Sequence, residues 1–137
     1  MADTSDEADS ILIVDGDVLV RHAIADYLRS CGYIVIEAAT TDEAATVLEQ
    51  TSVDVAALLC DADAAGSVNA FELRTRAQQQ RKGLIFALAG SVEGFAKKAA
   101  ELCEQGPDLA RPYDPQGVVD YIRRVLGTKR SGDVRTG

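Results

Sequence analysis

The stretch Ile11-Leu-Ile-Val-Asp-Gly-Asp17 decides the fold of this 137-residue chain. Its four apolar residues form a short continuous run, which is typical of a strand buried on both faces. Strands of this kind belong to parallel sheets, whose two faces are covered by helices. Similar runs occupy residues 33–36, 55–60 and 84–89, and a weaker candidate surrounds Leu109. The pattern therefore predicts five buried strands.

Apolar residues spaced three and four apart follow each run, as expected for helices that cover a sheet. Two of these helices carry clear start signals. Thr40 and Glu43 stand in capping-box spacing, and Asp114 precedes Pro115 at a first helical position. A helix expected over 69–80 has the smallest apolar face, which consists of Ala70, Leu73 and Ala77.

Five strand–helix alternations predict an α/β fold with a doubly wound, five-stranded parallel sheet. Right-handed crossovers favour the flavodoxin-like strand order 2-1-3-4-5. We expect one domain over residues 10–127, with an acidic disordered tail at 1–9 and a mobile tail at 128–137. In this order the switch point lies between the first and third strands, at their carboxyl ends, so function is expected there.

The composition excludes several classes of protein. The chain has 14 Lys and Arg against 22 Asp and Glu, a net charge of −8, which argues against binding nucleic acid through its phosphates. Its apolar runs are too short to span a membrane, and its acidic start is unlike a secretory signal. We therefore expect a cytoplasmic protein that binds neither nucleic acid nor membrane.

The cysteines and the single histidine give no sign of a metal or catalytic site. Cys31, Cys60 and Cys103 are odd in number and far apart, and they form no metal-binding motif. We expect all three to be reduced and mostly buried. His22 lies in a predicted helix and is interpreted as a solvated residue.

Four carboxylates converge on the predicted switch point. Asp15 and Asp17 follow the first strand, and Asp61 and Asp63 follow the third. Carboxylates this close repel one another, and Mg²⁺ is the usual remedy. The alternative is that Asp17 caps a helix and Asp63 begins a loop. Asp15 and Asp61 each end an apolar strand, where an unpaired charge is costly.

Such a site suits phosphoryl transfer. A carboxylate beside Mg²⁺ can attack phosphorus and form an acyl phosphate, while a cation and a hydroxyl contact the remaining phosphoryl oxygens. Arg111 can supply the cation. The fourth run ends without a hydroxyl, and Ser91 is the first candidate beyond it.

The order of these motifs resembles a bacterial response-regulator receiver domain over about residues 10–127. The resemblance implies that Asp61 accepts a phosphoryl group from a histidine kinase or phosphotransfer protein. It also implies a Mg²⁺ site formed by Asp15, Asp61 and the backbone carbonyl of Asp63, with Arg111 contacting the phosphate. The motifs that carry the resemblance are Ile-Leu-Ile-Val-Asp-Gly-Asp at 11–17, Asp61, Gly-Ser-Val-Asn-Ala at 66–70 and Arg-Pro-Tyr-Asp-Pro at 111–115.

The departures from the family pattern are equally specific. Gly16 stands where the family has a second acid, and Leu88, or Ala89 in a shifted register, stands where it has a hydroxyl. Arg111 replaces a lysine, and its planar guanidinium makes different contacts from an ammonium. Ala65 replaces a proline. The resemblance is therefore to a degenerate, atypical single-domain receiver with weak Mg²⁺ binding.

Three hypotheses of function remain open. The first is a phosphoacceptor receiver and the second a pseudo-receiver that binds a partner without phosphorylation; neither is an enzyme. The third is a haloacid-dehalogenase-like phosphatase with Asp15 as its nucleophile. A receiver would bind a downstream protein through the face of its fourth helix, fifth strand and fifth helix, which here carries Lys97, Lys98, Glu101, Asp120 and Arg124.

Overall fold

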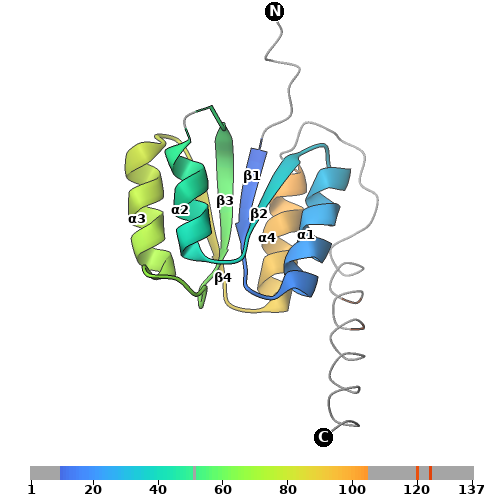
Figure 1. Ribbon diagram of the computed structural model, residues 1–137. Helices are drawn as coiled ribbons and strands as arrows, with labels where there is room; N and C mark the ends of the chain where they lie inside the picture. Colours follow the sequence, from blue (N-terminus) through green and yellow to red (C-terminus); the bar gives the residue numbers. More distant parts are fainter. Residues whose placement is uncertain (1–9, 51, 105–119, 121–123, 125–137) are drawn as a thin grey trace, which may run out of the picture.

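The computed structural model describes residues 10–50, 52–104, 120 and 124 (Figure 1). Four strands and four helices alternate along the first two of these ranges. The strands are β1 (Ser10–Val14), β2 (Ile34–Ala38), β3 (Val55–Asp61) and β4 (Ile85–Ala89). The helices are α1 (Val18–Ser30), α2 (Thr41–Glu49), α3 (Ala70–Gln80) and α4 (Val92–Glu104). No helix in the described ranges is long and apolar enough to cross a membrane.

All strand pairs are parallel, and the sheet order is β2-β1-β3-β4. This result confirms the α/β fold class and the predicted order of the first four strands. The strand boundaries differ from the predicted runs by two residues at most. The fifth strand expected near Leu109 lies outside the described residues, as does Arg111. Of the helix expected after Asp114, only residues 120 and 124 are described.

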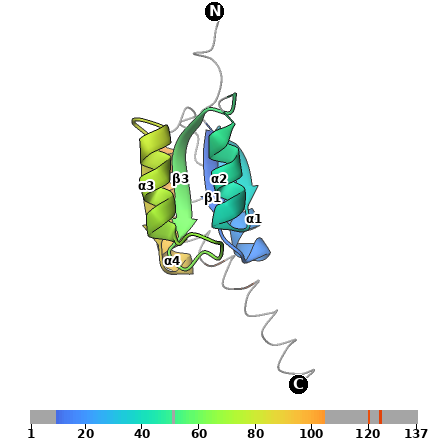
Figure 2. The same cartoon turned by 60° about the vertical axis from the view of Figure 1, so that its left-hand side comes forward.

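Helices α1 and α4 cover one face of the sheet, and helices α2 and α3 cover the other (Figure 2). Ile11 and Ile13 of β1 pack into one core with α1 and α4. Leu12 and Val14 pack into the opposite core with α2 and α3. Successive strand residues point to opposite faces, so the continuous apolar run of β1 supplies both cores.

The position of α4 is a finding that the sequence pattern does not give. α2 and α3 step across the sheet in one direction and lie on one face, whereas α1 steps the other way and lies on the other face. A right-handed crossover from β4 to a strand beyond it would therefore place its helix on the α2–α3 face. α4 instead packs beside α1, with the predicted stripe of Phe95, Ala99, Leu102 and Cys103 buried.

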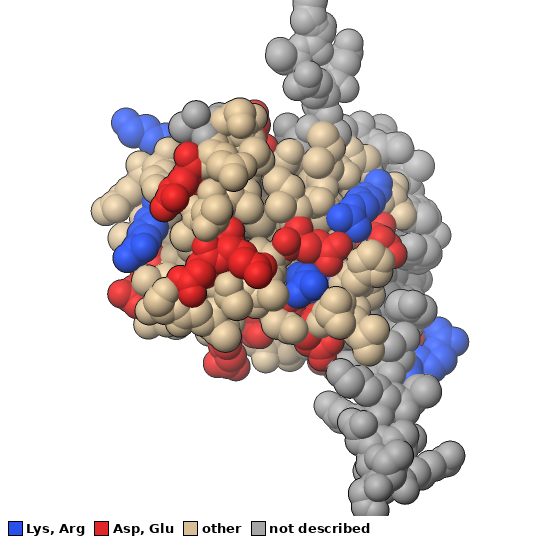
Figure 3. All heavy atoms as spheres, in the orientation of Figure 1, with Lys and Arg blue, Asp and Glu red and all other residues tan. Residues whose placement is uncertain are grey.

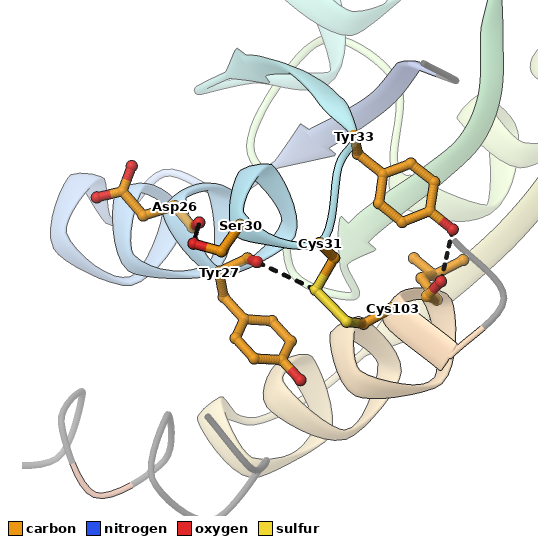
Figure 4. Close-up of a disulfide and its surroundings, with 7 residues drawn as sticks. Asp26, Tyr27, Ser30, Cys31, Tyr33 and Cys103 are labelled. Atoms are coloured by element: carbon orange, nitrogen blue, oxygen red, sulfur yellow. Dashed lines mark hydrogen bonds between the residues drawn. A yellow bond between two sulfur atoms is a disulfide. The ribbon is translucent and has the colours of Figure 1, made fainter. Parts of the chain in front are cut away.

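A disulfide joins Cys31, directly after α1, to Cys103 of α4 (Figure 4). The prediction of three reduced cysteines is therefore wrong for this pair. The two residues are 72 apart in sequence, but the parallel packing of α1 and α4 brings their Cα atoms to 5.4 Å. Beside the disulfide, the Tyr33 hydroxyl donates to the Leu102 carbonyl. Cys60 is free and buried, as predicted, and burial raises the pKa of its thiol to about 12.

The starts of α2 and α3 follow local capping rules. Thr40 caps α2, and its hydroxyl accepts the Glu43 amide at 3.1 Å, as predicted. Asn69 and Glu72 form a complete capping box at α3, each side chain accepting the other's backbone N–H. This capping box fixes the start of the helix with the smallest apolar face, whose buried residues are Ala70, Leu73 and Ala77, as predicted.

Candidate functional site

The carboxyl edge of the sheet brings Asp15 and Asp61 together. β1 and β3 are neighbours, so the residue that follows β1 lies beside the last residue of β3. Asp15 is only 7% exposed, and its amide donates to the Ala38 carbonyl at 3.1 Å. Asp61 is half-buried. Figure 3 shows acidic side chains across the middle of this face and also at its lower edge, where the strands end in Figure 1.

The pKa of Asp15 is raised to about 6, mainly by burial and in smaller part by the neighbouring carboxylates of Asp61 and Asp17. Two groups oppose this effect. The Asp17 amide donates to Asp15 Oδ1 at 2.9 Å, and the Arg21 guanidinium lies nearby. Asp15 is therefore a carboxylate whose negative charge is poorly stabilised by the surrounding protein, so a cation is the ligand that it favours.

Asp17 and Asp63 take the alternative roles considered from the sequence. Asp17 Oδ1 accepts the Leu19 and Val20 amides at 3.0 and 3.3 Å, which caps α1. Asp63 is exposed in the loop after β3, and its amide donates to Asp61 Oδ1 at 3.1 Å. Of the four predicted carboxylates, Asp15 and Asp61 are the two that neither cap a helix nor lie exposed in a loop.

Arg21 is a site residue that the sequence interpretation missed. Its Nη1 donates to the Asp15 carbonyl at 2.8 Å, and its Nε pairs with Glu37 at 3.0 Å. Glu37 Oε2 also lies 3.3 Å from His22 Nδ1 and 3.3 Å from Arg29 Nη1. Burial raises the pKa of Glu37, but hydrogen bonds from Arg21 and His22 outweigh burial and lower it below its usual value. The available signal was the position of Arg21, one helical turn beyond Asp17 and so directly above the strand end.

The strand register decides between the two candidate positions for the missing hydroxyl. Asp61 pairs with Ala89, and the Ala62 amide donates to the Ala89 carbonyl at 2.9 Å. Leu88 packs against the core under α2 and α3. Ala89 is therefore the residue beside Asp61, and its methyl group offers no hydrogen bond to a ligand there.

The carboxylates of Asp15 and Asp61 at this edge are oxygen donors of the type that Mg²⁺ prefers. The carbonyl of Asp63 is the further ligand that the family resemblance implies. The described residues hold no group of three or more His, Cys, Asp or Glu side chains suited to a metal ion. Gly16 leaves room for a further acid, because a Cβ there would meet only the Ala39 carbonyl oxygen, at 3.7 Å. Oxygen donors of this kind fit a divalent cation.

Solved structures with the same fold are response-regulator receiver domains. A CheY-like receiver domain protein from Methanospirillum hungatei JF-1 is 24% identical, with a TM-score of 0.54 over 90% of this chain and 98% of that chain. The chemotaxis response regulator CheY4 of Vibrio cholerae is 22% identical, with a TM-score of 0.54 over 85% of this chain and 98% of that chain.

A response regulator protein from Burkholderia pseudomallei, solved with a phosphorylated aspartic acid, a calcium ion and citrate, is 13% identical. Its TM-score is 0.53, over 94% of this chain and 75% of that chain. No family model matches the sequence, and neither does any curated protein. The chain thus has the fold of CheY-like receiver domains, as the sequence motifs indicated.

Proposed function

We propose that this protein is a receiver in phosphorelay signalling and that Asp61 is its phosphoacceptor. One observation carries the proposal: Asp61 ends the central strand β3 beside Asp15, a buried carboxylate with a raised pKa. In an open parallel sheet this edge, at the switch point, is where ligands bind. The receiver fold and the aspartyl phosphate of the Burkholderia pseudomallei neighbour support the same function.

The proposed reaction is a single group transfer. A carboxylate oxygen of Asp61 forms a bond to phosphorus, and the bond from phosphorus to the donor's leaving group breaks. The leaving group keeps the electron pair. Where the donor is a phosphohistidine whose other ring nitrogen is protonated, the leaving group is neutral imidazole. The product is an acyl phosphate on Asp61. The protein catalyses no turnover of a separate substrate in this proposal and takes its phosphoryl group from a histidine kinase or phosphotransfer protein.

Asp15, Asp61 and the Asp63 carbonyl would hold Mg²⁺, which when bound neutralises charge on the phosphoryl oxygens. Gly16 in place of an acid should make this binding weak. Gly16→Asp is expected to strengthen it at least tenfold, measured by calorimetric titration with Mg²⁺. Tight binding by the wild type, unchanged by the substitution, would contradict this assignment.

The phosphoacceptor is tested by intact mass after incubation with Mg²⁺ and phosphoramidate. Wild type should gain one phosphoryl group, and Asp61→Asn should gain none. Asp63→Asn is the matched control, because it removes a neighbouring exposed carboxylate and leaves the backbone carbonyl in place. Trapping the acyl phosphate with borohydride then locates it, and label on any residue other than Asp61 would overturn the proposal.

A pseudo-receiver is the second candidate, favoured by Ala89 beside Asp61 and by Gly16. It would gain no mass in the same experiment. The phosphatase hypothesis predicts label on Asp15 and needs Asp17 as a general acid. Because the Asp17 carboxylate already caps α1, the structure disfavours that chemistry.

Output through a bound protein remains part of the proposal. Among the described residues, Lys97 and Glu101 are exposed on α4. Lys98 Nζ lies 3.9 Å from Glu101 Oε1. Asp120 and Arg124 are exposed as well. The fifth strand that would complete the predicted face lies outside the described residues.

A further inference from the structure

The start of α2 holds the loop that follows Asp61. Thr41 is completely buried, and it and Asp15 are the only buried polar residues among those described. The Thr41 amide donates to the Ala65 carbonyl at 2.8 Å, and its hydroxyl donates to the Val68 carbonyl at 2.7 Å. One buried residue therefore holds two points of the β3–α3 loop.

Asp42 adds a second pair of contacts to the same loop. Its carboxylate accepts the Ser67 amide at 3.0 Å and also the Ser67 hydroxyl. These donors lower the pKa of Asp42 below its usual value. We call Thr41 and Asp42 the α2 clamp. Together they contact residues 65, 67 and 68.

Gly66 shows how closely the loop approaches the α2 clamp. Its φ is +145°, a conformation that favours glycine. A Cβ at Gly66 would lie 1.9 Å from Thr41 Oγ1 and 3.0 Å from its amide nitrogen. The close approach of the loop to α2 thus depends on the glycine at position 66 and on the buried hydroxyl of Thr41.

The opposite end of the loop is attached to the proposed phosphoacceptor itself. Asp61 Oδ1 accepts the Asp63 amide at 3.1 Å, and the Asp61 carbonyl accepts the Ala64 amide at 3.0 Å. Asp63, whose carbonyl is a proposed metal ligand, lies between Asp61 and the loop residues that the α2 clamp contacts. Groups that orient metal ligands commonly change metal affinity by 10- to 100-fold when they are removed.

We propose that Thr41 and Asp42 are positioning residues for the phosphoacceptor site, holding the β3–α3 loop so that the Asp63 carbonyl stays beside Asp61. This inference rests on the proposed function of Asp61. The α2 clamp touches neither metal nor phosphate and acts only through the loop.

The test compares Thr41→Val, Asp42→Asn and the control Thr46→Val. Thr46 lies on the same helix, but it is exposed and its hydroxyl donates to the Asp42 carbonyl rather than to the loop. Mg²⁺ titrations followed by amide chemical shifts should show about tenfold weaker binding in Thr41→Val and a smaller loss in Asp42→Asn. Amide exchange at residues 63–68 should accelerate in both variants, while exchange in the interior of α3 stays unchanged. Thr46→Val should match wild type in both measurements.

The outcomes separate this inference from the proposed function. If wild type binds Mg²⁺ and the clamp variants bind it equally well, positioning is wrong and the receiver function stands. If wild type neither binds Mg²⁺ nor gains a phosphoryl group at Asp61, the proposed function is wrong. The proposed effect of the α2 clamp on metal binding is then wrong as well. In that event unchanged exchange at 63–68 in Thr41→Val would also show that the α2 clamp does not hold the loop.

Discussion

The pair of helices on each face of the sheet is held together by different means. On one face, α1 and α4 share an apolar core and are joined by the Cys31–Cys103 disulfide. On the other, polar contacts supplement the core at both ends of α2 and α3. The α2 clamp holds the loop before α3, and Arg81 after α3 donates to the carbonyls of Leu48, Gln50 and Val53 at 2.7–3.0 Å.

The difference follows the distance along the chain. α2 and α3 are separated by one strand and two short loops, so hydrogen bonds suffice to fix their ends. α1 and α4 are separated by five other elements, and bringing them together orders a much longer loop. Because the entropy of loop closure rises with loop length, a cross-link on the α1–α4 face removes more freedom from the unfolded chain.

Removing the disulfide should give the largest effect. For a separation of 72 residues, chain entropy predicts that Cys31→Ala/Cys103→Ala lowers the free energy of unfolding by about 4 kcal/mol. Urea unfolding measures this loss. A reducing agent should destabilise wild type similarly and leave the double variant unchanged.

Thiol counting checks the same bond. Alkylation of denatured, unreduced protein should modify Cys60 alone. Modification of all three cysteines would show instead that the Cys31–Cys103 bond is absent.

Asp15 should give the next largest effect, on the α1 side of the carboxyl edge. Its pKa is about 6 when folded against 3.8 in an unfolded chain, a difference worth about 3 kcal/mol. Above pH 6 the carboxylate is charged in both states, and burial destabilises the folded one. This cost fades as the pH falls from about 6 to about 4, because the folded state takes up a proton first. Asp15→Asn should therefore stabilise the protein by up to about 3 kcal/mol at pH 7.5 and very little at pH 4.

Urea unfolding at the two pH values tests this prediction, with exposed Asp54→Asn as the control for loss of one negative charge. Equal stabilisation by Asp15→Asn at both pH values would show that burial does not shift the titration of Asp15.

Asp42, on the opposite face, should show the opposite dependence of stability on pH. Hydrogen bonds lower its pKa, so its contribution is present at neutral pH and is lost as the pH falls through its folded pKa.

Arg81 tests the polar side of the comparison. Arg81→Ala removes a charged donor from three carbonyls and should lower the unfolding free energy by about 2 kcal/mol. Arg81→Lys should recover only part of this, because an ammonium lacks the planar fork. Arg74→Ala, at an exposed position of α3, is the control. If it lowers the unfolding free energy as much as Arg81→Ala does, the loss comes from removing a positive charge and not from the three hydrogen bonds.

The smallest predicted effect belongs to the α3 capping box. Asn69→Ala removes the acceptor of the Glu72 amide and should cost about 1 kcal/mol by urea unfolding. Asn69→Asp keeps an acceptor and should stay within a few tenths of wild type. Equal losses in both variants would mean that the side chain stabilises α3 by another route.

Sequence patterns predict the parts of this molecule that depend on local chemistry. The four strands, the caps at Asp17 and Thr40 and the thin apolar face of α3 all follow from residue type and spacing. The meeting of Asp15 and Asp61 follows from strand order. The position of α4 does not, because its apolar stripe fits either face of a sheet and a right-handed crossover favours the α2–α3 face, whereas α4 packs beside α1. The disulfide depends on that position and could not be predicted without it.

The contacts of Arg21 and Thr41 escaped prediction for a related reason. The bonds that they donate to the Asp15 and Val68 carbonyls involve the backbone, which every residue possesses, so no partner residue type marks these two bonds in the sequence. Their targets become visible only when strand ends and loops are placed in space.

The disulfide also divides the chain mechanically. Residues 31–103 form a covalent ring that contains β2, β3 and β4, whereas β1 precedes the ring and lies between β2 and β3. A force applied at the amino end of β1 would therefore draw this interior strand out of a sheet whose remaining strands stay tethered. The 72-residue separation corresponds to roughly 240 Å of contour length that cannot extend until the sulfur–sulfur bond is cut.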